Sequence, residues 1–348
     1  MHGTVKRGFF TAPFIFLSTT VFILRVQIWS KYYILGTGTL LGAHNSRQEK
    51  EKMNRTIQYE IGAEEEGLTI KQFLKRRRYS GQNLVQLKKY EQGILLNNRP
   101  VYVIQPLKAG DLLTVNILED RVSEKIPPVP LPLHIVYEDE DLMILDKAAD
   151  MPIHPSLNNY ENSLANGLAW YFSAQDIPFV FRCVNRLDRD TTGLTIIAKH
   201  MVSSGILSVM ASRREIKREY LAIVSGTGLP SCGTIDVPLG RDPDSAIRRI
   251  ADFQNGEPSV THYRVLEETN GCSLLSLHLE TGRTHQIRVH MKYLGYPIIG
   301  DFLYNPDTTL IRRQALHSCR LEFSHPITGK PLDFSSPLPE DMKQALGR

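Results

Sequence analysis

The chain has 348 residues, a length that suggests about two domains. Hydrophobic residues make up 42% and charged residues 22%, which excludes collagen, a coiled coil, a low-complexity chain and a polytopic membrane protein. The net charge of +4 is too small by itself to predict a nucleic-acid partner. Four cysteines lie far apart without CxxC spacing, so we expect reduced thiols in a cytoplasmic protein and no zinc site.

The N-terminal stretch at 8–24 is uncharged and mostly apolar. A membrane anchor needs about 20 apolar residues, and this run is shorter and is interrupted by Pro13. Its basic, acid-poor surroundings fit a signal or transit peptide, but no convincing cleavage site follows. We favour a third interpretation, in which residues 1–52 precede the true start and Met53 begins the functional protein. This extension is left unassigned, and membrane attachment is not expected.

Positive charge gathers in a small module at 66–118. Between Ile70 and Tyr90 there are seven basic residues and no acidic ones, whereas the rest of the chain holds 34 bases and 37 acids. The seven are Lys71, Lys75, Arg76, Arg77, Arg78, Lys88 and Lys89. A solvated helix face would explain such a block. We prefer contact with RNA phosphates, which would position RNA without reading its sequence.

The same module shows a pattern of two helices followed by short strands. Apolar spacing predicts helices over 67–78 and 83–91, the second ending at Gly93, and strands over 94–96, 101–104 and 112–117. Turns are expected at 97–99 and 108–111. This arrangement, with the phrases Asn97-Asn98-Arg99-Pro100-Val101 and Lys108-Ala109-Gly110-Asp111, resembles the S4 RNA-binding domain.

A proline-rich linker at 119–133 separates this module from a larger domain at 134–340, because four prolines occur within 126–133. The larger domain lacks a regular βαβ alternation. We expect an α+β fold with a mixed, largely antiparallel sheet. The expected strands are 134–138, 142–146, 194–198, 219–224, 260–266 and 272–280, and the expected helices are 162–173, 202–213 and 284–294.

Two segments of the larger domain carry candidate chemistry. The first, 184–194, places Asp188 between Arg186 and Arg189, where positive charge favours an ionised carboxylate suited to a nucleophile or base. A structural Asp–Arg turn is the alternative. Gly193 permits a sharp backbone turn at its end.

The second segment is 280–290. A helix that starts between Thr281 and Thr284 could hold a phosphate or carboxylate at its N-terminus. Arg288 lies off the apolar stripe of this helix and could reach a carboxylate such as Asp188. His285 and His290 are five residues apart, which is wrong for a helical metal pair, so structural hydrogen bonds are expected of them.

These segments are similar to motifs of the RluA family of pseudouridine synthases. The phrase Asn185-Arg186-Leu187-Asp188-Arg189-Asp190-Thr191-Thr192-Gly193 resembles the family's HRLD-x-x-TSG signature. Residues 134–155 resemble its first motif, 281–301 its third, and 217–222 its tyrosine-bearing strand. His317 and 324–326 fit its C-terminal segment. The resemblance covers about residues 66–335.

Some positions depart from the family's usual pattern. Asn185 stands where His is commoner, and Thr192 where Ser is commoner. Asp146, Ala148 and Asp150 replace the commoner Asn, Pro and Gly, so the loop conformation there is open. Lys147 and His154 match motif positions, and we expect them to be structural or close to the RNA.

The resemblance implies that uridine in RNA is isomerised to pseudouridine without a metal or other cofactor. Asp188 would be the essential carboxylate, acting covalently on C1′ or on the ribose or base. Tyr220 would lie against the base and help remove the C5 proton, and Arg288 would pair with Asp188. Arg186 would enter the RNA stack and hold the uridine out of it. Asn185, Thr192, Gly193, Arg283 and His285 would support the site.

The expected substrate is structured RNA. RNA of the large ribosomal subunit is the first expectation, because an S4-like module precedes the catalytic domain, and transfer RNA is the alternative. A catalytically silent RNA-binding or ribosome-assembly protein on the same fold is a further alternative. The matching Asp188, Tyr220 and Arg288 argue against it.

Overall fold

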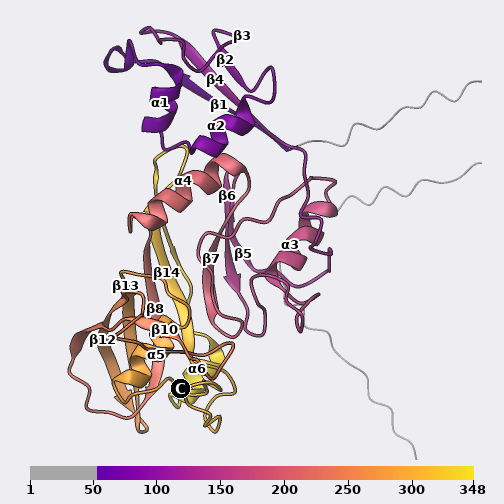
Figure 1. Ribbon diagram of the computed structural model, residues 1–348. Coiled ribbons are helices and arrows are strands. Elements are labelled where there is room, and N and C mark those ends of the chain that lie inside the picture. Colours follow the sequence, from indigo (N-terminus) through magenta and orange to yellow (C-terminus); the bar gives the residue numbers. More distant parts are fainter. Residues whose placement is uncertain (1–52) are drawn as a thin grey trace, which may run out of the picture. The chain divides into compact units, whose positions relative to one another are not determined.

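The computed structural model describes residues 53–348 (Figure 1). The expectations for the N-terminal extension concern residues 1–52, which lie outside the described part. Within residues 53–348, no helix is long and apolar enough to cross a membrane. The strands of this part form a nine-stranded sheet, a four-stranded sheet and a two-stranded ribbon.

The N-terminal module, residues 53–119, combines two short helices with the four-stranded sheet. Thr69 and Ser80 cap the two helices, each accepting a hydrogen bond from a main-chain N–H of the first turn. Asn97 and Asn98 have positive φ and form a tight turn between two strands. Its elements are β1 (Met53–Glu60), η1 (Ala63–Glu65), α1 (Ile70–Arg76), α2 (Gly81–Leu87), β2 (Ile94–Leu96), β3 (Arg99–Pro100) and β4 (Leu112–Glu119), and the sheet order is β1-β4-β2-β3.

Several sequence predictions for this module were wrong in detail. Residues 101–104 do not form a strand. The carbonyls of Val103 and Gln105 instead accept hydrogen bonds from the first N–H groups of α1, which lack partners within the helix. The helix α2 ends at Leu87 rather than at Gly93. The strand β1 was not expected, yet it pairs with β4 along its whole length.

The large sheet confirms the prediction of a mixed, largely antiparallel sheet. Among the described strands, one parallel pair joins β7 to β14, and every other neighbouring pair of the sheet is antiparallel. The strand order is β5 (Ile135–Glu138), β6 (Leu142–Lys147), β7 (Thr192–Ala198), β14 (Leu316–Ser324), β8 (Lys217–Ser225), β13 (Cys272–Leu279), β12 (Val260–Thr269) and β9 (Cys232–Asp236), with β15 (Pro331–Ser335) paired to β14. The strands β9, β14 and β15 were not predicted.

Four helices of the described part accompany this sheet. They are α3 (Leu164–Ser173), α4 (Met201–Ser212), α5 (Gln286–Tyr293) and α6 (Glu340–Ala345), and a ribbon of β10 (Leu239–Arg241) and β11 (Arg249–Ala251) precedes β12. The helix α5 begins later than predicted because His285 adopts a left-handed conformation with φ 58° just before it. Its Ile287 and Met291 are buried, as the apolar stripe predicted.

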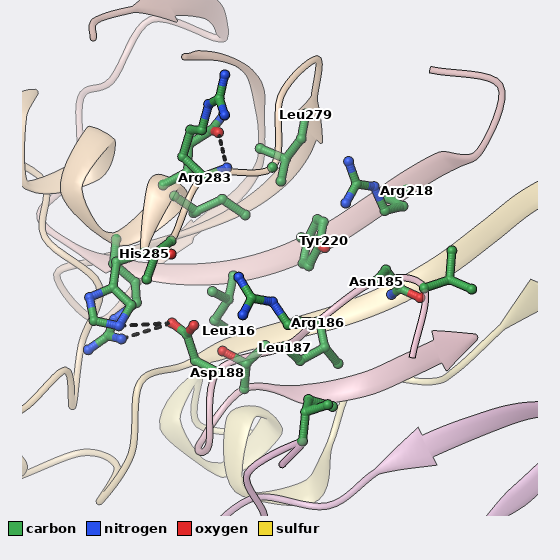
Figure 2. Close-up of a pocket in the computed structure, with 18 of the residues that line it drawn as sticks. Asn185, Arg186, Leu187, Asp188, Arg218, Tyr220, Leu279, Arg283, His285 and Leu316 are labelled. Atoms are coloured by element: carbon green, nitrogen blue, oxygen red, sulfur yellow. Dashed lines mark hydrogen bonds and ion pairs between the residues drawn. The ribbon is translucent and has the colours of Figure 1, made fainter. Parts of the chain in front are cut away.

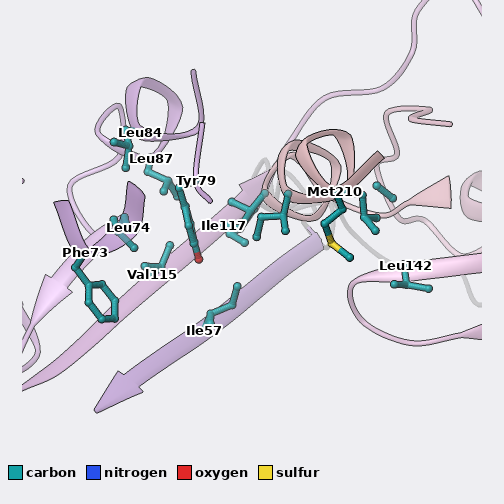
Figure 3. Close-up of a cluster of buried hydrophobic side chains, with 14 of the residues drawn as sticks. Ile57, Phe73, Leu74, Tyr79, Leu84, Leu87, Val115, Ile117, Leu142 and Met210 are labelled. Carbon is teal, nitrogen blue, oxygen red and sulfur yellow. The ribbon is translucent and has the colours of Figure 1, made fainter. Parts of the chain in front are cut away.

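One hydrophobic cluster crosses the predicted boundary between the module and the larger domain. Ile57, Phe73 and Val115 of the module belong to the same buried cluster as Leu142 of β6 and Met210 of α4 (Figure 3). Burial of a continuous apolar surface is the main stabilising term in folding. The module therefore shares a core with the sheet that carries β6 and β7.

Buried polar groups reinforce this junction. The Glu119 carboxylate accepts hydrogen bonds from Arg182 Nη2 at 2.9 Å and from the main-chain N–H of Met201 at 2.7 Å. Asn83 Nδ2 donates to the Met201 carbonyl at 2.9 Å. The Pro-rich segment also packs on α3, where Asn166 Nδ2 donates to the Pro127 carbonyl. Contacts of this kind fix orientation, because each buried polar group needs its partner.

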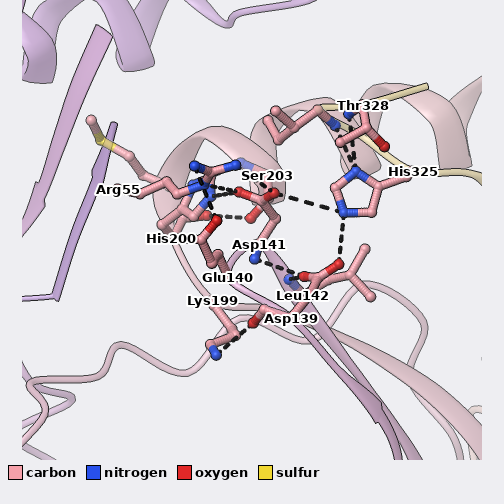
Figure 4. A network of polar contacts seen from close by, with 12 residues as sticks. Arg55, Asp139, Glu140, Asp141, Leu142, Lys199, His200, Ser203, His325 and Thr328 are labelled. Atoms are coloured by element: carbon pink, nitrogen blue, oxygen red, sulfur yellow. Dashed lines mark hydrogen bonds and ion pairs between the residues drawn. The ribbon is translucent and has the colours of Figure 1, made fainter. Parts of the chain in front are cut away.

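A second set of polar contacts at the junction is centred on Asp141 (Figure 4). Arg55 of β1 donates to both Asp141 oxygens, with Nε 2.9 Å from Oδ1, and His200 Nε2 lies 2.8 Å from Oδ1. Burial alone would raise the pKa of Asp141, but the contacts with His200 and Arg55 outweigh it and lower the pKa. An ionised carboxylate thus ties β1 to the start of β6.

Candidate active site

A cavity of about 400 Å³ gathers the predicted catalytic residues from three separate parts of the chain. The loop before β7 contributes Arg186 and Asp188, β8 contributes Tyr220, and the segment that leads into α5 contributes His285 (Figure 2). The helix α5 itself contributes Arg288. Asn185 and Arg283 also line it. Asp188 is the one carboxylate among the described residues that line the cavity.

Strand register explains how distant segments meet here. Gly193 of β7 lies opposite Ser318 of β14, and Ser318 lies opposite Tyr220 of β8. Gly193, Ser318 and Tyr220 thus form a row across three neighbouring strands. The loop that carries Asp188 joins β7 just before this row, so Asp188 and Tyr220 line the same cavity. Gly193 has φ 106°, and a Cβ there would lie 2.2 Å from the Ser318 carbonyl oxygen. Only glycine fits this close approach of two strands.

Hydrogen bonds from Asn185 and Thr192 hold the loop and strand on either side of Asp188. Asn185 is buried: its Oδ1 accepts from the Ile196 N–H at 2.8 Å and its Nδ2 donates to the Leu194 carbonyl. Thr192 Oγ1 lies 2.9 Å from His317 Nδ1. Both residues depart from the commoner family residue but retain local hydrogen bonds.

The central ion pair joins Asp188 to Arg288. Arg288 Nη1 donates to Asp188 Oδ2 at 2.8 Å, while Nε and Nη2 donate to the two oxygens of Asp301 at 2.7 and 2.8 Å. The Arg288 side chain is 2% exposed and that of Asp301 is fully buried, whereas Asp188 is 26% exposed. A buried bidentate pair therefore orients the guanidinium, which in turn holds the accessible carboxylate.

Electrostatics keep this arginine charged. Burial alone would lower the pKa of Arg288, but hydrogen bonding to Asp301 and the charge of Asp188 outweigh it and raise the pKa. Burial also lowers the pKa of His285, so this imidazole is biased toward its neutral form although its Nε2 lies 3.8 Å from Asp188 Oδ2. Its Nδ1 lies 3.0 Å from the Tyr304 hydroxyl.

Tyr220 is 5% exposed and lines the cavity. Burial raises its pKa, so the phenol keeps its proton at neutral pH. Such a tyrosine presents an aromatic face and a neutral hydroxyl rather than a phenolate.

Lys147 donates hydrogen bonds to the main chain of the loop that carries Asp188. It is 1% exposed, and its Nζ donates to the carbonyls of Ala148 and Arg189 at 2.7 and 2.8 Å. Burial lowers the pKa of Lys147 to about 7. Because Arg189 follows Asp188 directly, these hydrogen bonds fix the main chain next to the carboxylate.

The basic block of the module is not part of the cavity and divides into two groups. Lys71, Lys75, Arg76, Lys88 and Lys89 are exposed and form no ion pair within residues 53–348. Arg77 instead pairs with Glu65 and lies over the Phe73 ring, and Arg78 pairs with Glu215. These two arginines therefore have side-chain partners within the protein, which the charge count alone did not reveal.

Sequence reasoning missed Asp301 and Arg218. Asp301 is the last residue of the third motif, so the motif contained it without indicating its task. Arg218 lies two residues before Tyr220 on β8 and lines the same cavity. Side chains two residues apart on a strand lie on the same face, so the spacing of Arg218 and Tyr220 could have placed Arg218 at the cavity.

One group of side chains has the composition of a metal site. Ligand atoms of Asp139, Asp141 and His325 lie within 4.8 Å of one another. Their oxygens already accept hydrogen bonds, however: Asp139 Oδ2 from His325 Nε2 and Tyr137, and its Oδ1 from two main-chain N–H groups. Together with the contacts of Asp141, this makes the group a structural network rather than a vacant coordination sphere (Figure 4).

Comparisons with known proteins identify the class. A family model described as RNA pseudouridylate synthase matches residues 141–293, which include Asp188, Tyr220 and Arg288. The uncharacterized RNA pseudouridine synthase YjbO of Bacillus subtilis is 39% identical over 80% of this chain and 98% of its own length. Ribosomal large subunit pseudouridine synthase D of Escherichia coli K12 is 38% identical over 68% of this chain and 76% of its own.

Solved structures agree on the fold. Human RNA pseudouridylate synthase domain containing 1 is 27% identical with a TM-score of 0.51, covering 61% of this chain and 85% of that one. The fold and the sequence relatives are therefore those of an RNA-modifying isomerase. The chain belongs to the RluA family of RNA pseudouridine synthases. The S4 resemblance of the N-terminal module and the cytoplasmic location stay predictions.

Proposed function

We propose that this enzyme converts specific uridines of large-subunit ribosomal RNA to pseudouridine, with Asp188 as its catalytic carboxylate. The observation that carries the assignment of Asp188 is its position: it is the accessible member of a buried Asp301–Arg288–Asp188 chain and faces the cavity. Support for the ribosomal target comes from relatives named ribosomal large subunit pseudouridine synthase D, including one of Nitrosomonas europaea that is 43% identical over 62% of this chain and 65% of its own length.

The proposed reaction is an isomerisation, so atoms are conserved in the product. The bond from ribose C1′ to N1 breaks, a bond from C1′ to C5 forms, the C5 proton leaves and N1 gains a proton. Asp188 acts either on C1′ directly or on the ribose or base, and Arg288 pairs with it and holds its orientation. Because Tyr220 keeps its proton at neutral pH, we assign it to contact with the uracil face rather than to service as a phenolate base.

Access to the uridine requires base flipping, because its reacting atoms are hidden inside a helix. We assign Arg186 to the vacated position in the stack. Its side chain is exposed at the edge of the cavity, two residues from Asp188, and forms no ion pair within the described residues. Exposed cations of the N-terminal module would add phosphate contacts that hold the RNA without reading its sequence.

The test is pseudouridine mapping of total RNA by carbodiimide-dependent reverse-transcription stops, with and without the gene. Loss of a stop in large-subunit RNA on deletion supports the proposal, and loss only in transfer RNA would redirect it. Complementation with Asp188→Asn should not restore the stop, because removal of a catalytic carboxylate costs at least about a thousandfold in rate. Retention of every pseudouridine in the deletion strain would support the catalytically silent alternative.

A further inference from the structure

The cavity contains more positive charge than its carboxylate can balance. Among the described residues, four arginines line it, namely Arg186, Arg218, Arg283 and Arg288. Arg288 is paired with Asp188 and Asp301, and Arg283 is paired with Glu257. Arg186 and Arg218 have no ion pair and no side-chain hydrogen bond to other residues of the described range, so these two guanidinium groups are free to bind a ligand.

Arg218 differs from Arg186 in its surroundings. It is half-buried, and it rises from β8 on the same face as Tyr220 (Figure 2). A Cβ on Gly282 would lie 3.3 Å from Arg218 Nη1 and 3.5 Å from Nη2, so the guanidinium rests against the main chain of the loop that leads into α5. It is thereby confined beside the tyrosine. Partial burial of a cation without a counter-charge is costly, which favours an anionic ligand at this position.

The chemistry of a nucleotide narrows the choice of that ligand. Uracil and ribose are uncharged at neutral pH, and the only anion that a flipped uridine carries is its phosphodiester linkage. An arginine presents a planar fork of N–H donors that matches phosphate oxygens. With the uracil against Tyr220 and C1′ near Asp188, a flanking phosphate is the group left for Arg218.

We propose that Arg218 and the main chain at Gly282 form a phosphodiester subsite for one of the two phosphates that flank the flipped uridine. This inference rests on the proposed function, because it needs RNA in the cavity. Arg218 is a binding residue in this scheme. It holds the backbone while Asp188 reacts, so its loss should weaken capture of the nucleotide more than the positioning of Asp188.

The experiment combines variants with chemically altered RNA. The substrate is a synthetic stem-loop that carries the mapped uridine labelled with tritium at C5, and kcat/KM is measured from tritium release. Wild type, Arg218→Gln and Arg218→Lys are each tested on the normal RNA and on RNAs with a neutral methylphosphonate in place of the 5′ or the 3′ flanking phosphate. Arg264→Gln is the matched control, since Arg264 is exposed on β12 and lies outside the cavity.

We expect Arg218→Gln to lower kcat/KM about 10- to 100-fold on normal RNA, as loss of a charged hydrogen bond does, with a smaller loss for Arg218→Lys. One methylphosphonate should cause a similar loss in wild type and no further loss in Arg218→Gln. Circular dichroism should show each variant folded.

The inference would be overturned if, at both flanking phosphates, the methylphosphonate lowered kcat/KM by the same factor in Arg218→Gln as in wild type. Full activity of Arg218→Gln on normal RNA would also overturn it. Either result would leave the proposed function standing as long as the wild type converts the RNA. Failure of the wild type to convert any uridine of total RNA would instead remove the proposed function, and the subsite with it.

Discussion

Arg288 Nη1 lies 2.8 Å from Asp188 Oδ2, although 100 residues separate the two in the chain. The pair is asymmetric: the arginine is buried and anchored by Asp301, and the aspartate is the exposed end. The buried ion pair between Arg288 and Asp301 therefore holds the Asp188 carboxylate in place. Its orientation depends on Asp301 as much as on Arg288.

This asymmetry predicts the result of removing the arginine. In Arg288→Met, Asp301 is left as a buried unpaired charge, and the free energy of unfolding should fall by about 3–5 kcal/mol. Adding Asp301→Asn to the same chain removes that charge and should restore much of the stability but none of the activity. Urea denaturation measures the first effect and tritium release the second. Equal stability of Arg288→Met and wild type would contradict the prediction.

Lys147 makes stability depend on pH in a defined window. Its pKa is about 7 in the folded protein, and about 10.4 is usual for an exposed lysine, so between these values the unfolded chain binds more protons. The free energy of unfolding should therefore rise with pH from about 7 to 10, by up to about 1.4 kcal/mol per pH unit from this group.

The measurement compares pH profiles of wild type and Lys147→Met from urea denaturation. Other groups titrate in both proteins, so only the difference between the two slopes reports on Lys147. Below about pH 7 that difference should vanish, because the lysine is then protonated in both states. Parallel profiles between pH 7 and 10 would show that the ammonium keeps its proton when buried.

The contact between Arg55 and Asp141 should stabilise the junction of the N-terminal module with the sheet. Their side chains are 19% and 4% exposed, so Arg55→Ala leaves a nearly buried carboxylate whose remaining basic neighbours are two imidazoles, those of His200 and His325. We expect a loss of about 2–3 kcal/mol in the free energy of unfolding, less than for a fully buried pair. As a control, Lys343→Ala breaks an exposed pair with Glu340 and should cost under about 0.5 kcal/mol. Equal effects would contradict the importance of burial here.

How much of this could be predicted from the sequence is clear at the ion pair. Arg288 lies off the apolar stripe of α5, so the sequence predicted that its side chain could reach a carboxylate outside the helix. The motif at 184–194 supplied Asp188 as that carboxylate. Asp301 was missed because it follows the helix in an irregular segment, where no periodicity indicates direction. The ion pair between Asp301 and Arg288 forms only when the segment after α5 folds back against that helix.

The strand order was harder to predict for the same physical reason. Elements with local signals, such as β6 and α4, were found within a residue or two. The strand β14 lies between β7 and β8 although more than 90 residues separate it from β8 in sequence, and its pairing is decided by long-range packing. Likewise, Val101–Ile104 has the composition of a strand, but its carbonyls are used by α1.

The exposed lysines of the module should determine how salt affects RNA binding. Removing one phosphate contact lowers the slope of log Kd against log salt by about 0.7–0.9. The double variant Lys71→Gln, Lys88→Gln should therefore reduce the slope by about 1.5. The matched double variant Lys125→Gln, Lys330→Gln removes exposed charge elsewhere and should leave the slope unchanged. Equal slopes in all three proteins would argue for a merely solvated helix face.

Gly193 offers a sharp test of the strand row that unites the site. Its positive φ and the approach of the Ser318 main chain exclude any side chain, so Gly193→Ala must push β7 away from β14. We expect a loss of at least about 3 kcal/mol in the free energy of unfolding, together with loss of tritium release. Gly228 also has a positive φ, of 85°, but a Cβ there would meet no atom within 4 Å, so Gly228→Ala should cost only about 1–2 kcal/mol of backbone strain. Equal destabilisation by the two substitutions would mean that conformation alone, and not the contact between β7 and β14, requires glycine at 193.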